Sequence, residues 1–518
     1  MSSSLLKSTG VVGAMTLLSR VLGFARDVVF AVVFGAGAGM DAFLVAFKIP
    51  NFMRRLFAEG AFAQSFVPVL SATRSGGSQA EVQALIDVVS GTLAVILLGI
   101  TVVGVVAAPL FILIFAPGFV LTDGPGPLAA ELLRWTFPYL LFISLTAMAG
   151  GILNTYGRFA VPAFTPVLLN LCLIGAALLL APRLAQPELG LAIGVFLAGL
   201  AQLIFQVPFL WRLGLLPRPR WGWRDSQVRR ILKLMLPILF GSSVAQVNLL
   251  LDTAIASLLA AGSVSWLYYS DRLMEFPLGV FSIALGTVIL PSLSARHAEA
   301  EPARFSATLD WALKLVIVLG LPAMAGLFVL AGPLIATLFQ YQSFGVQDVL
   351  MSRYSLCAYA FGFMGFSLVK VLVPGYFSRE DTRTPVRFGV ISLAAAMVMN
   401  VVFVGAVVAL DWPAPHAGLA LGTSLGAFVN AGLLFRGLRA EGVYQASAGW
   451  VPLLSRVMVA TLTMSALLFW LAGDIDSWLA AGASERATWL FTLIGAGLAV
   501  YAVVIAVLGL RPRHLRAA

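Results

Sequence analysis

Long apolar runs separated by short polar segments follow one another along the whole chain. Most are close to the roughly 20 residues that a helix needs to cross a bilayer, so the pattern predicts an all-α, polytopic membrane protein. The second and eighth runs contain Pro50 and Pro277, where we expect the helix to be interrupted. Fourteen spans are predicted, near residues 9–34, 40–71, 84–115, 130–153, 161–181, 189–210, 230–259, 264–294, 308–338, 351–376, 385–410, 416–436, 451–473 and 487–510.

The composition agrees with this class of protein. Of the 518 residues, 60% are hydrophobic and only 11% are charged, whereas soluble domains carry about 25% charged residues. The net charge of +10 would suggest nucleic-acid binding in a soluble chain. Here it fits basic cytoplasmic loops, and we expect no nucleic-acid partner. Two cysteines in apolar runs and three scattered histidines predict neither a disulfide framework nor a metal site.

Basic residues in the polar loops indicate the orientation. With the N-terminus in the cytoplasm, nearly all loop arginines fall on the cytoplasmic side, and Arg183 and Arg486 are the exceptions. An even number of spans with both termini inside is therefore predicted. The longest loop, 211–229, carries three tryptophans among its arginines, which is typical of an amphipathic segment lying on an anionic leaflet. A plain connector is an equally good interpretation.

Short matches at nearly one offset indicate an internal repeat. The sequence PVLSA at 68–72 recurs as PSLSA at 291–295, and two further matches follow in the same order. The offset spans six helices, so the halves share their orientation, an architecture that transporters use to build a site between two lobes. The predicted division is an N-lobe at 1–210, a linker at 211–229, a C-lobe at 230–440, and two added helices with a cytoplasmic tail at 441–518.

Several short segments match catalytic sequence patterns, but none of them predicts a catalytic site in this chain. Gly422–Gly426 matches a nucleophile elbow, but it lies in an apolar span with no acid or histidine placed to serve Ser424. Small residues that let helices pack closely are the better interpretation. Ser367–Lys370 matches a penicillin-binding pattern with as little support, and the glycines at 35–39 are interpreted as a flexible turn. We therefore expect a protein that is not an enzyme.

Charged residues in the first span are the first candidates for a functional site. A charged side chain at the bilayer centre costs roughly 2.5–3.5 kcal/mol on insertion scales. Several charged side chains in one span therefore indicate that they line a cavity or have a function. At about 100° per residue, Arg20 and Arg26 lie on either side of Gly23 and can border one cavity. Asp27 shares a face with Arg20 and could neutralise it when no substrate is bound. Ion pairs between packed helices are the alternative.

The second span adds further charges. Asp41 and Lys48 are seven residues apart on one face, and Arg54 follows the proline of this span. Arginine forks suit pyrophosphate and carboxylate oxygens, because two parallel hydrogen bonds can form. We predict that Arg54 also lines the cavity, whereas Arg55 and Glu59 are interpreted as paired or interfacial residues.

The second half carries a smaller set of charges within its spans. The repeat nearly aligns Arg272 with Lys48, so we predict basic groups at similar depth in both lobes, facing each other across the pseudo-axis. Lys370 in the tenth span is a further candidate for the cavity. Asp252 in the seventh span is an intramembrane acid that could couple a cation or a proton, together with Asp381 at the end of the tenth span.

Four segments of the sequence are SRVLGFARD, DAFLVAFKIPNFMRRLFAEGAFAQSFVP, SVSWLYYSDRLMEFPLG and ALGTVILPSLS. They resemble the signature segments of the MurJ (MviN) lipid II flippase family, which belongs to the multidrug/oligosaccharidyl-lipid/polysaccharide exporter superfamily. The resemblance runs essentially end to end and implies fourteen helices, two lobes in a V around a cationic cavity, and a lipid-tail groove on the last two helices. It implies essential cavity arginines at Arg20, Arg26, Arg54 and Arg272, with Asp41 as a further position.

The resemblance implies a lipid II flippase that moves the undecaprenyl-pyrophosphate-linked peptidoglycan precursor to the outer leaflet of the bacterial inner membrane by alternating access. It implies lipid II and membrane lipids as partners, and we also expect cell-wall synthesis proteins. No hydrolysis motif is visible, so we expect no cofactor and a driving force from membrane potential or a coupling cation. Alternatives are an exporter of another polyprenyl-linked glycan or of drugs, and a non-transporting membrane scaffold or enzyme.

Overall fold

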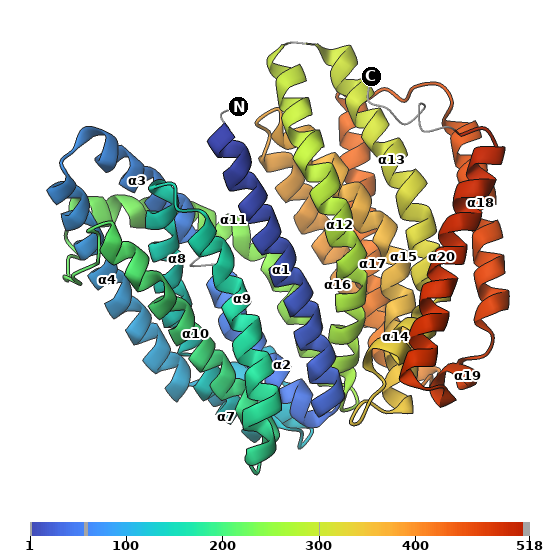
Figure 1. Ribbon diagram of the computed structural model, residues 1–518, viewed down its shortest axis with the longest axis horizontal. Helices are drawn as coiled ribbons and strands as arrows, with labels where there is room; N and C mark the ends of the chain where they lie inside the picture. Colours follow the sequence, from blue (N-terminus) through green and yellow to red (C-terminus); the bar gives the residue numbers. More distant parts are fainter. Residues whose placement is uncertain (1–2, 56–60, 300, 511–518) are drawn as a thin grey trace. The chain divides into compact units, whose positions relative to one another are not determined.

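All regular secondary structure among the described residues of the computed structural model is helical, and no strand occurs among them (Figure 1). This confirms the predicted all-α class. The backbone is described at residues 3–55, 61–299 and 301–510. Side chains are described at the same residues except 3–9, 237, 239–249 and 280–288.

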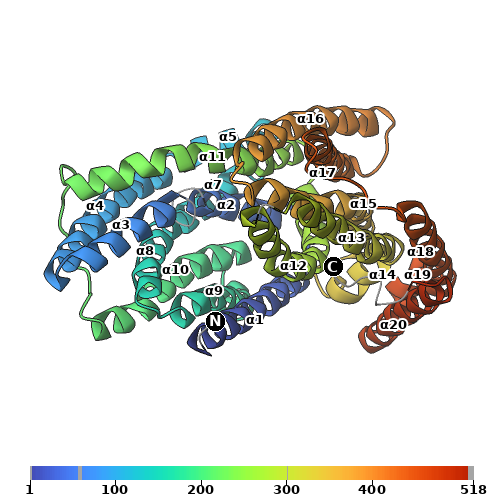
Figure 2. The ribbon, with the colours of Figure 1, turned by 90° about the horizontal axis from the view of Figure 1, so that it is seen from above.

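Contacts between residues divide the chain into two compact units, Met1–Ser265 and Trp266–Ala518. In the first unit, α1 and α9 lie side by side, and α10 packs on α8 and α9 (Figure 2). Its elements are α1 (Ser3–Phe34), α2 (Ala38–Arg54), α3 (Ala63–Gly76), α4 (Gln79–Val106), α5 (Ala108–Phe115), α6 (Gly118–Leu121), α7 (Gly126–Thr136), α8 (Tyr139–Thr155), α9 (Ala160–Gly175), the π-helical η2 (Ala176–Leu180), the 3-10 turn η3 (Ala181–Arg183), α10 (Pro187–Arg212) and α11 (Ser226–Ser257).

The second unit contains the remaining helices. In it, α17 packs between α15 and α16, and α18 packs on α13 and α20 (Figure 1). Its elements are nearly all of α12 (Ser263–Ala298), α13 (Pro302–Val329), α14 (Ala331–Phe339), α15 (Val346–Phe377), α16 (Arg383–Ala409), α17 (Pro415–Ala440), α18 (Trp450–Ala472), α19 (Ile475–Ala480) and α20 (Ala483–Val507).

Each of the fourteen predicted spans coincides with one helix or with two consecutive helices. Ten helical segments among the described residues are long and apolar enough to cross a membrane. The predicted interruptions at Pro50 and Pro277 are wrong, because both prolines lie inside continuous helices. Pro50 cannot donate a hydrogen bond to the carbonyl of Ala46, and the Thr136 hydroxyl of α7 donates to that carbonyl instead at 2.9 Å. A neighbouring helix therefore satisfies the backbone group that the proline leaves free.

The division between the units differs from the predicted linker at 211–229. Helix α11, predicted to open the C-lobe, packs on α3, α4, α5 and α6 of the first unit. Its buried Val228 and Ile231 join the core that contains Phe66 and Ile86. The helix that begins the second repeat therefore completes the hydrophobic core of the first unit.

The internal repeat is visible in the helix boundaries. Helices α4 and α13 have equal length, and their ends are separated by the same 223 residues that separate the two PxLSA segments. Equivalent positions also build the two cores, because buried Leu70 and Ile86 correspond to buried Leu293 and Leu309. The two halves therefore share helix register as well as sequence matches.

Arg486, one of the two exceptions to the predicted loop-charge rule, has a structural role. Its side chain is buried and donates hydrogen bonds to the carbonyls of Ala336 (3.0 Å), Gln340 (3.2 Å) and Leu479 (2.8 Å). These carbonyls lie at the C-terminal ends of α14 and α19, where a cation is favoured by the helix dipole. Arg486 therefore ties α20 to both helices, independently of membrane orientation.

Candidate functional site

Arg26 on α1 is held by two neighbouring side chains of the first unit. Its Nε and Nη2 donate to Oδ1 of Asp27 at 3.0 and 2.7 Å, and its Nη1 donates to Oδ1 of Asn170 on α9 at 3.1 Å. The guanidinium also lies 5.6 Å from the centre of the Phe30 ring. Its side chain is 11% exposed. The orientation of the guanidinium group is therefore fixed by two neighbouring side chains and by the face of an aromatic ring.

Asp27 pairs with Arg26 in the structure, which corrects the prediction that it neutralises Arg20. Arg20 is exposed and makes no ion pair with any residue that the structure describes. Gly23, which lies between the two arginines on α1, faces α9, where a Cβ would lie 3.6 Å from Nδ2 of Asn170. That Nδ2 donates to the Ser19 carbonyl at 3.0 Å. The glycine thus permits the close contact between α1 and α9 that orients Arg26.

Asp41 at the beginning of α2 binds the N-terminal end of α12. Its buried carboxylate accepts hydrogen bonds from the backbone N–H of Gly262 (2.7 Å) and from both the backbone N–H (2.8 Å) and hydroxyl (2.5 Å) of Ser265. The first N–H groups of a helix have no partner within the helix, and a carboxylate is favoured there by the helix dipole. Asp41 therefore acts as a capping group supplied by another helix.

The other charged residues of α2 also contact partners within the first unit. Lys48 donates from Nζ to the Thr253 hydroxyl of α11 at 2.9 Å, next to the half-buried Asp252. Lys48 and Asp41 therefore use one face of α2 to contact residues 253–265, as their seven-residue spacing predicts. Arg54 donates from Nε to Oδ1 of Asn51 at 2.9 Å, one turn earlier on the same helix.

Within the second unit, Arg272 on α12 pairs with Glu275 at 2.6 Å and lies 5.0 Å from the centre of the Tyr268 ring. Its side chain is 33% exposed, so it is far more accessible than Arg26. Lys370 on α15 is exposed and has no ion pair among the described residues. Both cations keep solvent-accessible groups, as a ligand-binding side chain requires.

Asp381, predicted as one of two coupling acids, caps α16. Its Oδ1 accepts hydrogen bonds from the backbone N–H groups of Arg383 and Thr384, each at 3.0 Å. Hydrogen bonds from Thr384 and from Arg383 hold the pKa of the Asp381 carboxyl below its ordinary value. A carboxyl held in its ionised form by a helix terminus is poorly suited to take up a proton.

Sequence reasoning missed the partners that hold these charges. Asn170, Thr253 and Ser265 lie 144, 205 and 224 residues from the side chains that they bind. The signal for Asn170 was present, because an amide inside the apolar run of α9 is costly without a partner. No group of three or more His, Cys, Asp or Glu side chains able to hold a metal occurs among the described residues.

Comparisons with known proteins point to one family. The family described as lipid II flippase MurJ matches residues 30–482. A protein named probable lipid II flippase MurJ from Vibrio cholerae is 49% identical over 100% of this chain and 98% of its own length. A protein named lipid II flippase MurJ from Burkholderia cenocepacia is 42% identical over 91% of each chain.

Solved structures agree with the sequence comparisons. A structure described as lipid II flippase MurJ in an inward closed conformation has a TM-score of 0.78 and 25% identity, and the match covers 96% of this chain and 98% of that one. An inward-facing multidrug transporter of the MATE family has a TM-score of 0.63 at 16% identity, over 84% of this chain and 98% of that one. The second match supports the fold alone.

Proposed function

The chain belongs to the MurJ family of lipid II flippases, and from this premise we propose that it moves lipid II from the cytoplasmic to the outer leaflet of the bacterial inner membrane by alternating access. The observation that carries this function is the similarity along essentially the whole chain to proteins named as lipid II flippases, at 49% and 42% identity. The apolar helices agree with a multi-pass membrane protein. Both termini are proposed to lie in the cytoplasm.

Arg26 is proposed to bind the pyrophosphate of lipid II. Its guanidinium is already oriented by Asp27 and Asn170, so little conformational entropy is lost when an oxyanion binds. A pyrophosphate carries more negative charge than the single carboxylate of Asp27 and can compete for one edge of the fork. Arg20, exposed on the same helix, supplies a second cation that is not held in an ion pair by any described residue.

Arg54, Arg272, Lys48 and Lys370 are proposed as further head-group contacts. Asp41 is proposed as a positioning residue, because its two oxygens already accept three hydrogen bonds at the start of α12. Transport is proposed to use the membrane potential or a cation gradient. Asp252 is the better candidate for a coupling acid, since Asp381 is held in its ionised form by α16.

The test is transport of fluorescent lipid II in liposomes that contain the purified protein. We expect Arg26→Gln and Arg20→Gln each to lower the flipping rate about 10–100-fold, because a hydrogen bond to a charged group contributes about 1.5–3 kcal/mol. Arg304→Gln is the matched control, since Arg304 is exposed at the start of α13 and pairs locally with Glu301. Its rate should equal that of the unmodified protein.

Two outcomes would contradict the proposal. Retention of full transport by Arg20→Gln, Arg26→Gln and Arg272→Gln would remove the cationic head-group site. Equal movement of lipid II, a second polyprenyl-linked glycan and a drug cation would support a general exporter instead. Thermal unfolding of each variant in detergent separates loss of transport from loss of folding.

A further inference from the structure

The loop between α10 and α11, residues 213–225, is bound to α4 along its length. The buried carboxylate of Asp87 accepts a hydrogen bond from the backbone N–H of Arg218 at 2.8 Å, and the Asp87 carbonyl accepts one from the N–H of Arg220 at 2.9 Å. The N–H of Gly222 donates to the Thr92 hydroxyl at 3.1 Å. These hydrogen bonds hold the loop backbone, and the side chains that the loop carries, in fixed positions against α4. A plain connector would lack such bonds.

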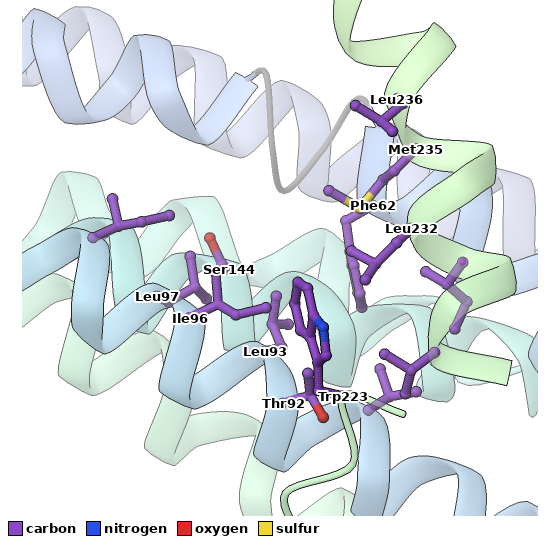
Figure 3. Close-up of a pocket in the computed structure, with 14 residues that line it drawn as sticks. Phe62, Thr92, Leu93, Ile96, Leu97, Ser144, Trp223, Leu232, Met235 and Leu236 are labelled. Carbon is purple, nitrogen blue, oxygen red and sulfur yellow. The ribbon is translucent and has the colours of Figure 1, made fainter. Parts of the chain in front are cut away.

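An apolar pocket of about 450 Å³ lies between α4, α8, α11 and the end of this loop (Figure 3). Trp223 from the loop stands between side chains of α4 and those of α11 in Figure 3. The pocket is almost wholly apolar, and a hydrocarbon chain is the kind of ligand that such a lining favours. Its lining includes Leu93, Ile96, Leu97, Trp223, Leu232 and Met235.

A second pocket, of about 530 Å³, lies at the start of α11 and is basic. None of its six lining residues is acidic, and the carboxylate of neighbouring Asp225 is used by the helix N-terminus, where it accepts from the N–H groups of Gln227 and Val228. Four cations around one concavity suit a phosphate group. The lining residues are Arg224, Ser226, Arg229, Arg230, Lys233 and Leu234.

The two pockets share the first turns of α11. Ile231 and Leu232 on one face line the apolar pocket, whereas Arg230 and Lys233 on the opposite face line the basic one. The two pockets also meet at consecutive residues at the end of the loop, because Trp223 lines the apolar pocket and Arg224 lines the basic pocket.

A tryptophan pair lies at the same end of α11. The rings of Trp221 and Trp223 are stacked, with their centres 6.2 Å apart. Trp221 is 60% exposed and Trp223 is 48% exposed. Exposed tryptophans mark the level of lipid head groups in membrane proteins. A phosphate site and a hydrocarbon site thus lie around one helix start at the level where a lipid has its phosphate.

We propose that an anionic phospholipid binds at the start of α11, with its phosphate in the basic pocket and one acyl chain passing Trp223 into the apolar pocket. The site uses none of the residues proposed to bind the lipid II head group. Its lipid would fill the space between α11 and the rest of the first unit, so we expect it to stabilise the packing of the helix that begins the second repeat.

Native mass spectrometry of the purified full chain tests this site with phosphatidylglycerol and phosphatidylethanolamine as probes. We expect the unmodified protein to retain phosphatidylglycerol at least tenfold better. The double variant Arg229→Gln/Arg230→Gln should reduce that preference to about threefold or less. The matched control Arg212→Gln/Arg218→Gln removes the same charge at residues that do not line the basic pocket, and should keep the preference. Equal loss in both variants would show attraction by net charge alone and overturn the site.

The acyl-chain part of the proposal has its own variant. Ile96→Phe on α4 reduces the volume of the apolar pocket, and we expect it to lower retention of both phospholipids at least fivefold. Undiminished retention would show that no chain enters the pocket and would overturn this part of the site. Thermal unfolding of Ile96→Phe in detergent shows whether the variant is folded, and Leu97→Phe provides a second filling variant should it unfold.

Competition experiments identify the source of the phosphate. Free pyrophosphate and lipid II are added separately to the protein with bound phosphatidylglycerol. We expect neither to displace it at equimolar concentration, since lipid II is proposed to bind elsewhere. Displacement by lipid II would assign the basic pocket to the transport substrate, and displacement by pyrophosphate would show a simple anion site. Because binding is measured without transport, the result is independent of the flippase assay.

Discussion

Asp87 on α4 and Asp310 on α13 occupy equivalent positions in the two halves of the repeat, 223 residues apart. Both carboxylates are buried, and each binds the loop that follows the sixth predicted span of its own half. Asp87 binds the loop 213–225, which leads into α11, and Asp310 binds the loop 441–449, which leads into α18. Each unit therefore attaches the next helix of the chain through an acid on its third span.

The partners of the two acids differ in kind. Asp87 accepts from the backbone N–H of Arg218 and from the Gln83 amide at 2.7 Å. Asp310 accepts one long backbone hydrogen bond, from the N–H of Ser447 at 3.4 Å, and otherwise accepts from side chains. These are the Tyr444 hydroxyl (2.8 Å), the Ser447 hydroxyl (2.6 Å), the Trp450 indole (2.7 Å) and the Lys314 ammonium (2.8 Å).

The residue four positions after each acid explains this difference. In the first unit it is Gly91, where a Cβ would clash with the backbone of Arg220. In the second unit it is Lys314, whose side chain pairs with Asp310 and donates to the Ser447 hydroxyl of the loop. The same scaffold therefore holds one loop by close backbone approach and the other by a charged side-chain network. The first attachment should be sensitive to volume and the second to charge.

The largest effect is expected from Asp310→Ala. It leaves the buried Tyr444 hydroxyl and the half-buried Trp450 indole without their acceptor and removes the ion-pair partner of Lys314, at a cost of about 3 kcal/mol in the free energy of unfolding. Asp87→Ala should cost less, about 1–2 kcal/mol, because it frees neutral donors only. Unfolding of both variants in detergent measures the two costs. Equal costs would show that the charge network adds nothing to the second attachment.

These attachments mark the limit of what the sequence predicts. The lengths of the apolar runs predict each helix, and the short matches predict the 223-residue register, since both depend on local pattern and chain order. Asp87 and Asp310 were not identified, because an acid near a helix start is ordinarily a solvated residue, and their loop partners lie more than 130 residues away.

The candidate site divides in the same way. Arg26 and Asp41 were predicted because a charge inside an apolar run needs a reason. Their partners, Asn170 and the start of α12, depend on how helices pack and not on local sequence. The continuity of α2 through Pro50 likewise depends on Thr136 of another helix.

An intermediate effect is expected from Gly91→Ala, which tests the close backbone approach. The added methyl group forces the loop away from α4 and weakens the bond from the Arg220 N–H to the Asp87 carbonyl, at a cost of about 1–3 kcal/mol. Hydrogen exchange of the loop amides should accelerate. Gly99→Ala is the matched control on the same helix, because a Cβ there meets no atom within 4 Å, and it should stabilise the protein by about 0.5–1 kcal/mol. Slow exchange in Gly91→Ala would contradict the volume argument.

The smallest effect concerns a cap that only the second half has. Helix α16 is capped by Asp381, whereas its counterpart α9 has Phe159 before it and no side-chain cap. Asp381→Ala should therefore cost about 1 kcal/mol, and hydrogen exchange should rise only in the first turn of α16. Asp381→Asn is the matched variant, because an asparagine side chain still accepts the two backbone hydrogen bonds and should restore most of the protection.

The cap also predicts a pH dependence, because its hydrogen bonds hold the pKa of Asp381 below the ordinary value of about 3.9. A lowered pKa in the folded state means that the cap contributes fully above the pKa of the unfolded chain and is lost as the pH falls through that of the folded protein. Protection of the Arg383 and Thr384 amides, corrected for intrinsic exchange, should be constant near neutral pH and fall on acidification. In Asp381→Asn the same amides should show no such fall, since the amide does not titrate. A parallel decline in both proteins would assign the pH dependence to another group and leave the α16 cap as a neutral hydrogen-bond acceptor.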